Sequence, residues 1–148
     1  MAAVENKINT ILVGQDIEKR IVFKNALKAL KIEPFQYFFE VEKGMFYLDA
    51  YGVIKPDFIF IEAGKKEDAL EAISKIRSSQ QFDTTSIVLH NTGYNETDTK
   101  DVFSAGANVA IRKNYDFNGL KTVLNHIIRF DSQYHSGTNN RETYMLSI

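Results

Sequence analysis

The stretch Lys55-Pro56-Asp57-Phe58-Ile59-Phe60-Ile61-Glu62-Ala63-Gly64 decides the fold of this chain. Phe58 to Ile61 is a run of four large apolar residues. A run this short, bounded by turn signals, predicts a strand that is buried on both faces. Pro56 precedes the run, where its missing N–H does least harm to a sheet. The run ends in the carboxylate of Glu62, and ligands collect at the carboxyl ends of strands in open parallel sheets. Glu62 is therefore the first candidate for a functional residue.

Strand and helix patterns alternate on both sides of this run. Further strands are predicted at residues 8–13, 37–41, 86–89 and 108–111. Amphipathic helices are predicted at residues 17–30, 45–52, 67–78, 97–105 and 117–130. The expected N-terminal caps of helices are Asp16, Thr97 and Asp116, and Gly106 is placed to end a helix. On the first helix, Lys19 is expected to face solvent. The alternation predicts an α/β fold with a single five-stranded parallel sheet and helices on both faces.

Composition narrows the class of protein. The chain has 148 residues, 44% of them hydrophobic, which suits one domain. A net charge of −1 gives no reason to expect a nucleic-acid-binding surface. The absence of cysteine excludes disulfides and thiolate metal sites. The apolar runs are too short to span a membrane, and the N-terminus lacks the pattern of a signal peptide. We therefore expect a cytoplasmic protein that binds neither nucleic acid nor membrane.

Three segments make the chain resemble a response-regulator receiver domain, the CheY-like family. The first is Ile11-Leu12-Val13, followed by a polar loop and a helix with Arg20. The second is the stretch from Lys55 to Glu62. The third is Ser104-Ala105-Gly106-Ala107-Asn108-Val109-Ala110-Ile111-Arg112-Lys113, which is similar to the family's Ala-Gly-Ala turn, fifth strand and lysine. The resemblance implies a flavodoxin-like, CheY-like (βα)5 domain at residues 1–131, followed by a polar C-terminal tail at residues 132–148. We expect strands three and five to flank the first strand. In the tail, we expect the apolar Tyr144-Met145-Leu146 to fray, and the alternative is that it docks onto the domain or onto a partner.

The resemblance also assigns positions in the family's reaction, which is acyl phosphate formation on an aspartate with the help of Mg²⁺. Glu62 stands at the phosphoacceptor position, Gly14 and Gln15 at those of the acidic metal-holding pair, Asn91 and Ala110 at the two switch positions, and Lys113 at that of the family's lysine. Most of these residues differ in kind from those of the family. Ala110 leaves no aromatic ring to rotate, and Asn91 carries an amide in place of a hydroxyl group.

These differences change the expected chemistry. Mg²⁺ prefers oxygen ligands with one or two carboxylates, and Gln15, Asp16 and Glu62 are the remaining candidates. Because Asp16 is expected to cap a helix, we expect no cofactor, with weakly held Mg²⁺ as the alternative. The extra methylene of Glu62 moves its carboxylate forward by about 1.5 Å, which disfavours in-line phosphoryl transfer. We expect Glu62 to pair with Lys113, either as an imitation of a phosphoryl group or as a structural ion pair only. His90 is expected to be packed or hydrogen-bonded and not to ligate a metal.

The leading functional hypothesis is an atypical stand-alone receiver domain that signals by binding a protein and is not an enzyme. Its partner would be a histidine kinase or a signalling output protein, held by the helix at 97–105, the strand ending at Ile111 and the last helix. One alternative is a divergent receiver that is still phosphorylated within a phosphorelay. The other is a flavodoxin-like cofactor-binding enzyme. Against it, the loops Gly14-Gln15-Asp16 and Asn91-Thr92-Gly93 lack a phosphate cradle.

Overall fold

The computed structural model describes residues 8–14, 16–32, 35–38, 56–90, 93–137 and 146–147, with the backbone alone at 35–38, 132–137 and 146. The elements follow the order β1 (Thr10–Val13), α1 (Ile17–Ala29), β2 (Phe35–Phe38), β3 (Phe58–Glu62), α3 (Lys66–Arg77), a 3₁₀ turn (Gln80–Phe82), β4 (Ser86–His90), α4 (Glu96–Ala105), β5 (Val109–Ile111), α5 (Phe117–Gly137) and β6 (Leu146–Ser147). The short helix expected at 45–52 lies outside the described residues, as does the end of the strand expected at 37–41. None of the helices within the described ranges is long and apolar enough to cross a membrane.

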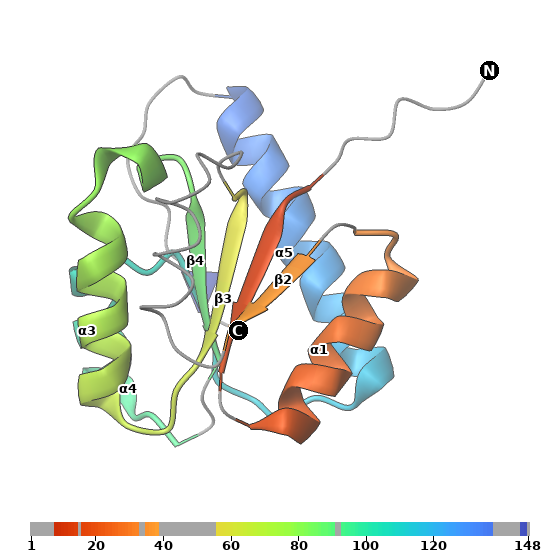
Figure 1. The fold of residues 1–148 in the computed structure, drawn as a ribbon, viewed down its shortest axis with the longest axis horizontal. Helices are drawn as coiled ribbons and strands as arrows, with labels where there is room; N and C mark the ends of the chain where they lie inside the picture. The colour runs from red at the N-terminus through yellow and green to blue at the C-terminus, as the bar shows by residue number, and fades with distance from the viewer. Residues whose placement is uncertain are drawn as a thin grey trace.

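The strands form one parallel sheet in the order β2-β1-β3-β4-β5-β6. Helices α3 and α4 cover one face, and α1 and α5 cover the other (Figure 1). The prediction of a parallel α/β sheet with helices on both faces is confirmed. The described residues contain six strands, one more than predicted, because the C-terminal segment adds β6 beside β5. The expectation that strands three and five flank the first is wrong: β1 lies between β2 and β3, and β4 separates β3 from β5.

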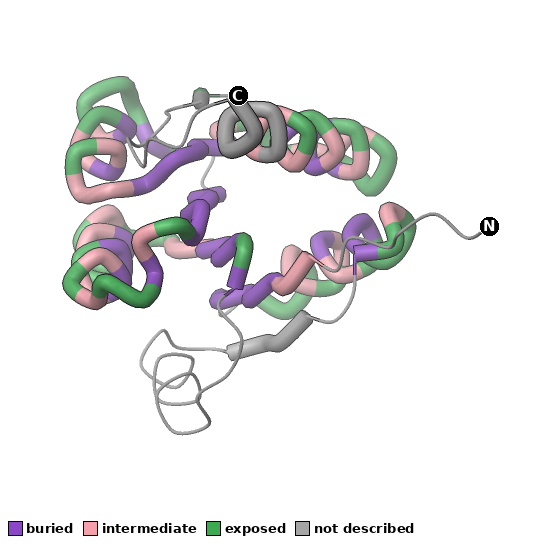
Figure 2. The backbone as a smooth tube through the Cα atoms, turned by 90° about the horizontal axis from the view of Figure 1, so that it is seen from above, coloured by how far each residue is buried: buried purple, intermediate pink, exposed green. Residues whose placement is uncertain are grey.

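Strand β3 lies at the centre of the core, as its apolar run predicted. Phe58 and Phe60 point into the cluster under α1 and α5, whereas Ile59 and Ile61 point into the cluster under α3 and α4. None of the four is more than 3% exposed. Full burial of such a side chain contributes about 1.5–3 kcal/mol each. The buried strands form the middle layer between the helices when the molecule is seen from above (Figure 2).

Two of the expected helix starts are confirmed. The side chain of Asp16 accepts a hydrogen bond from the Lys19 N–H at 3.1 Å and caps α1. The side chain of Asp116 accepts one from the Gly119 N–H at 2.8 Å before α5. Gly106 ends α4 with a φ of 123°, a backbone conformation that favours glycine.

The expected cap at Thr97 is wrong, because α4 begins at Glu96 and its cap lies two residues before Thr97. Asn95 is the cap, and its side chain accepts a hydrogen bond from the Asp98 N–H at 2.8 Å. The side chain of Asp98 in turn accepts one from the Asn95 N–H at 3.2 Å. This reciprocal pair satisfies two backbone donors at once, which a cap at Thr97 would not achieve.

Helix α5 continues to Gly137, beyond the expected end near Phe130. The apolar pattern of the helix stops at Phe130. The hydroxyl group of Ser86 on β4 nevertheless donates a hydrogen bond to Asp131, the next residue of α5. This polar contact holds the extended helix to the sheet. The domain boundary expected after residue 131 therefore falls within α5.

Candidate functional site

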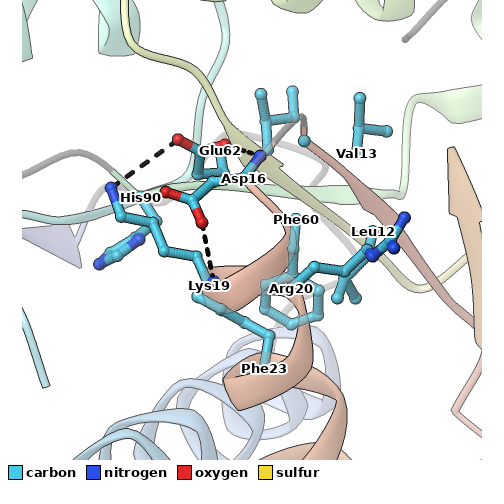
Figure 3. Close-up of a pocket in the computed structure, with 11 residues that line it drawn as sticks. Leu12, Val13, Asp16, Lys19, Arg20, Phe23, Phe60, Glu62 and His90 are labelled. Carbon is cyan, nitrogen blue, oxygen red and sulfur yellow. Dashed lines mark hydrogen bonds and ion pairs between the residues drawn. The ribbon is translucent and has the colours of Figure 1, made fainter. Parts of the chain in front are cut away.

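The candidate site lies where the carboxyl ends of β1, β3 and β4 meet the first turn of α1. The strand register sets Val13 beside Ile61 and Glu62 beside His90. The chain leaves β1 through Gly14 and enters α1. The pocket formed there has an apolar base, which includes Phe23 and Phe60, and a charged rim (Figure 3).

Glu62 contacts two groups at the start of α1, one on the cap residue and one in the first turn. Its Oε2 accepts a long hydrogen bond from the Asp16 N–H at 3.4 Å, and its Oε1 lies 3.8 Å from the Lys19 Nζ (Figure 3). The Glu62 side chain is 19% exposed and that of Lys19 is 35% exposed. A carboxylate is stabilised at a helix N-terminus by the free N–H groups and the helix dipole. The negative charge of Glu62 is therefore met by the protein's own helix and ammonium group.

Gly14 makes room for this arrangement. A Cβ atom at Gly14 would lie 3.0 Å from both the Cβ and the Oε2 of Glu62. An acidic residue at position 14 would therefore clash with the Glu62 side chain and place a second negative charge beside it. Glycine after β1 therefore leaves the space that the glutamate side chain at the end of β3 occupies.

The donor set is a poor match to the Mg²⁺ that the resemblance implies. Gln15 lies outside the described residues, and the carboxylate of Asp16 caps α1. The carboxylate of Glu62 has the Lys19 ammonium beside it. In the part of the chain that the structure describes, no three His, Cys, Asp or Glu residues gather to hold a metal ion. Mg²⁺ needs several oxygen ligands in near-octahedral geometry, and a neighbouring ammonium opposes its charge.

His90 is packed in the core of the site, as expected. It is 5% exposed, and its ring and that of Phe23 pack in an edge-to-face arrangement with 5.3 Å between centroids. Burial lowers its pKa below the usual 6.5. A backbone hydrogen bond with Lys113 raises this pKa, the Lys19 charge lowers it and the Glu62 charge raises it, each by less than burial does. Its Nδ1 has no hydrogen-bond partner among the described residues. A neutral imidazole is the form that suits this environment.

The expected ion pair between Glu62 and Lys113 does not form within the described ranges. Lys113 is exposed, and Glu62 pairs with Lys19. In the register, Glu62 lies beside His90 on β4, and His90 lies beside Ile111 on β5, two residues before Lys113. Of the two switch positions, Ala110 is buried in β5 at 4% exposure, and Asn91 lies outside the described residues.

Lys19 is the residue that sequence reasoning missed. It was assigned to the solvent face of α1 from the helical pattern. However, the first turn of a helix that follows a strand lies at the strand's carboxyl end. A lysine three residues after the cap could therefore have been tested as a partner of Glu62.

No protein-family model and no curated protein sequence matches the chain. Several solved structures match its fold. The chemotaxis response regulator CheY4 of Vibrio cholerae has a TM-score of 0.69 and 15% identity, covering 82% of this chain and 99% of its own. The phosphorylated cyanobacterial phytochrome response regulator RcpA has a TM-score of 0.70 and 21% identity, and the match covers 84% of this chain and 93% of RcpA. The Mn²⁺-bound response regulator Rcp1 has a TM-score of 0.68 and 18% identity, and the match covers 83% of this chain and 93% of Rcp1. The chain therefore has the fold of the response-regulator receiver domains, the CheY-like fold.

Proposed function

We propose that this chain is an atypical receiver domain that acts in two-component-type signal transduction by binding a protein partner, without aspartyl phosphorylation. The fold likeness to response regulators supports the signalling role. The observation that carries the proposal is the state of Glu62. Its carboxylate stands at the phosphoacceptor position and is already engaged by the Lys19 ammonium and the α1 N-terminus.

Phosphoryl transfer depends on in-line positioning and on cations that neutralise the developing charge. RcpA has been captured phosphorylated and Rcp1 with bound Mn²⁺. In this chain the cation paired with Glu62 is the ammonium group of Lys19. An ammonium carries one positive charge where Mg²⁺ carries two, so it neutralises less of the charge that develops in phosphoryl transfer. A phosphoryl group at Glu62 would also have to displace contacts that the carboxylate already makes.

The same contacts suit a domain that stays in one signalling state. Glu62 supplies a permanent negative charge at the end of β3, and Lys19 and α1 are arranged around it. At the switch position in β5, Ala110 has no ring that could change orientation. In our proposal the partner, a histidine kinase or an output protein, binds α4, β5 and α5, and the interaction is set by the presence of the chain and not by its phosphorylation.

The test is incubation of the intact chain with acetyl phosphate and Mg²⁺, followed by intact-mass measurement. A competent receiver domain treated in parallel shows that the donor is active. The expected result is no stable mass gain in this chain. A stoichiometric phosphoryl gain that disappears in Glu62→Gln would overturn the proposal and establish a phosphorylation-competent receiver. The double variant Gly14→Asp/Glu62→Asp restores two acidic residues and shortens the side chain at position 62, although the contact of the new Cβ with the Cβ of residue 62 remains.

A further inference from the structure

The C-terminal strand covers one edge of the sheet. Strand β6 pairs in parallel with β5, with Val109 beside Leu146 and Ala110 beside Ser147. It is the last strand in the sheet order. Without β6, the N–H and C=O groups along the outer side of β5 would have no strand partner from this sheet edge.

Without β6, strand β5 would be an edge strand that could pair with a strand of another chain. Its three residues are Val109, Ala110 and Ile111, at 0%, 4% and 0% exposure. An apolar strand with unpaired backbone groups is a template for pairing with another chain. The fold brings the C-terminus back to this edge and so covers it.

The pairing of β6 with β5 is shorter than the pairings between strands in the middle of the sheet. β6 contributes two paired residues, whereas β1 and β3 share four and β3 and β4 share five. The side chain of Ser147 is exposed. The strand follows the end of α5 at Gly137 after the eight residues 138–145. Among the described residues, β6 is therefore held to β5 by two paired positions.

We propose that β6 is a displaceable cover and that the edge of β5 is an acceptor site for an extended peptide segment. In the isolated chain the occupant is the chain's own C-terminus. In the bound state the occupant is an extended, largely apolar segment of a protein partner that adds in parallel to β5, as β6 does. Backbone hydrogen bonds would supply the affinity in this binding mode. The inference rests on the proposed function in one respect, because β5 belongs to the surface that we assign to the partner.

An engineered disulfide tests whether β6 pairs with β5 of the same chain. The natural chain has no cysteine, so Ala110→Cys/Ser147→Cys introduces the only pair. Paired residues on neighbouring strands lie about 5 Å apart, within the Cα range of a disulfide. We expect an intramolecular bond in the monomer. Ser147→Cys combined with Ser74→Cys, an exposed position on α3, is the matched control and should remain reduced.

Competition with the chain's own C-terminal peptide tests displacement. The probe is a labelled peptide of residues 141–148, added to the intact chain, to a chain that lacks residues 146–148, and to the locked variant in its oxidised and reduced forms. A tethered strand competes at millimolar effective concentration, so the shortened chain should bind the peptide at least about tenfold more tightly than the intact chain. The reduced double-cysteine variant should bind like the intact chain, and the oxidised form should not bind.

Equal binding to the oxidised and reduced forms would overturn the proposal. So would a folded shortened chain that does not bind the peptide. If the shortened chain does not fold, the comparison of oxidised and reduced forms decides alone. Neither a phosphodonor nor the partner is used, so this result is separate from the test of phosphorylation.

Discussion

The ion pair between Lys19 and Glu62 should be measurable as a coupling in a double-mutant cycle. At the observed separation of 3.8 Å, two unit charges attract by about 1 kcal/mol in water and about 4 kcal/mol at an effective dielectric constant of 20. Because the Lys19 side chain is 35% exposed, the value should lie near the lower figure, at about 0.5–1.5 kcal/mol. Lys19→Met, Glu62→Gln and the double variant would be unfolded with urea at neutral pH. The double variant should lose less free energy of unfolding than the sum of the two single variants.

Lys113→Met is the matched control for this cycle, since it also removes one ammonium and keeps the aliphatic stem. Lys113 is exposed and stands on the other side of β4 from Glu62. Its coupling to Glu62→Gln should be within about 0.3 kcal/mol of zero. Raising the salt concentration should reduce the Lys19 coupling, because a partly exposed pair is screened. A coupling to Lys113 that exceeds the coupling to Lys19 would refute the assignment of Lys19 as the partner of Glu62.

Three further changes test other parts of the account by thermal or urea unfolding. Gly14→Ala should destabilise by about 1–2 kcal/mol, because its Cβ would lie 3.0 Å from the carboxylate side chain of β3, whereas Gly64→Ala, with open space around it, should not. Arg77→Lys should cost about 2 kcal/mol, since Arg77 donates four hydrogen bonds of 2.8–3.0 Å to oxygens just before β4 and β5; a loss below 0.5 kcal/mol would contradict this. The lowered pKa of His90 means that the unfolded state takes up a proton near its usual value of 6.5 before the native state does, so stability should fall as pH drops below about 6.5. His90→Leu should remove that part of the pH dependence, and the exposed His126→Gln should retain it.

The fold could be predicted because its signals are local and repeated. The run from Phe58 to Ile61 is apolar at every position, and a strand with both faces covered requires that pattern. Glu62 could be found for the same reason, since it is the first polar residue after the run. The helix caps at Asp16 and Asp116 depend only on the residues that follow them.

The rest of the site depends on contacts between distant segments. The pairing of Lys19 with Glu62 and the fit of Gly14 against Glu62 both require β1 to lie beside β3. The pairing expected with Lys113 was wrong because the Lys19 ammonium, from the first turn of α1, lies beside the Glu62 carboxylate, whereas the Lys113 side chain is exposed. Strand β6 was not predicted, because two residues carry almost no pattern. The expected fraying is wrong at Leu146, which pairs with β5, and the alternative of docking onto the domain holds for that residue.

The most direct test of the central claim is an amide NMR titration of the intact chain with Mg²⁺ and then with beryllium fluoride, a phosphoryl analogue. The claim is that the Glu62 carboxylate is already satisfied by Lys19 and the α1 N-terminus. The account predicts no saturable shifts at the amides of Gly14, Asp16 and Glu62 with either addition. Saturable Mg²⁺-dependent shifts at these amides, followed by a new set of signals with beryllium fluoride, would contradict it.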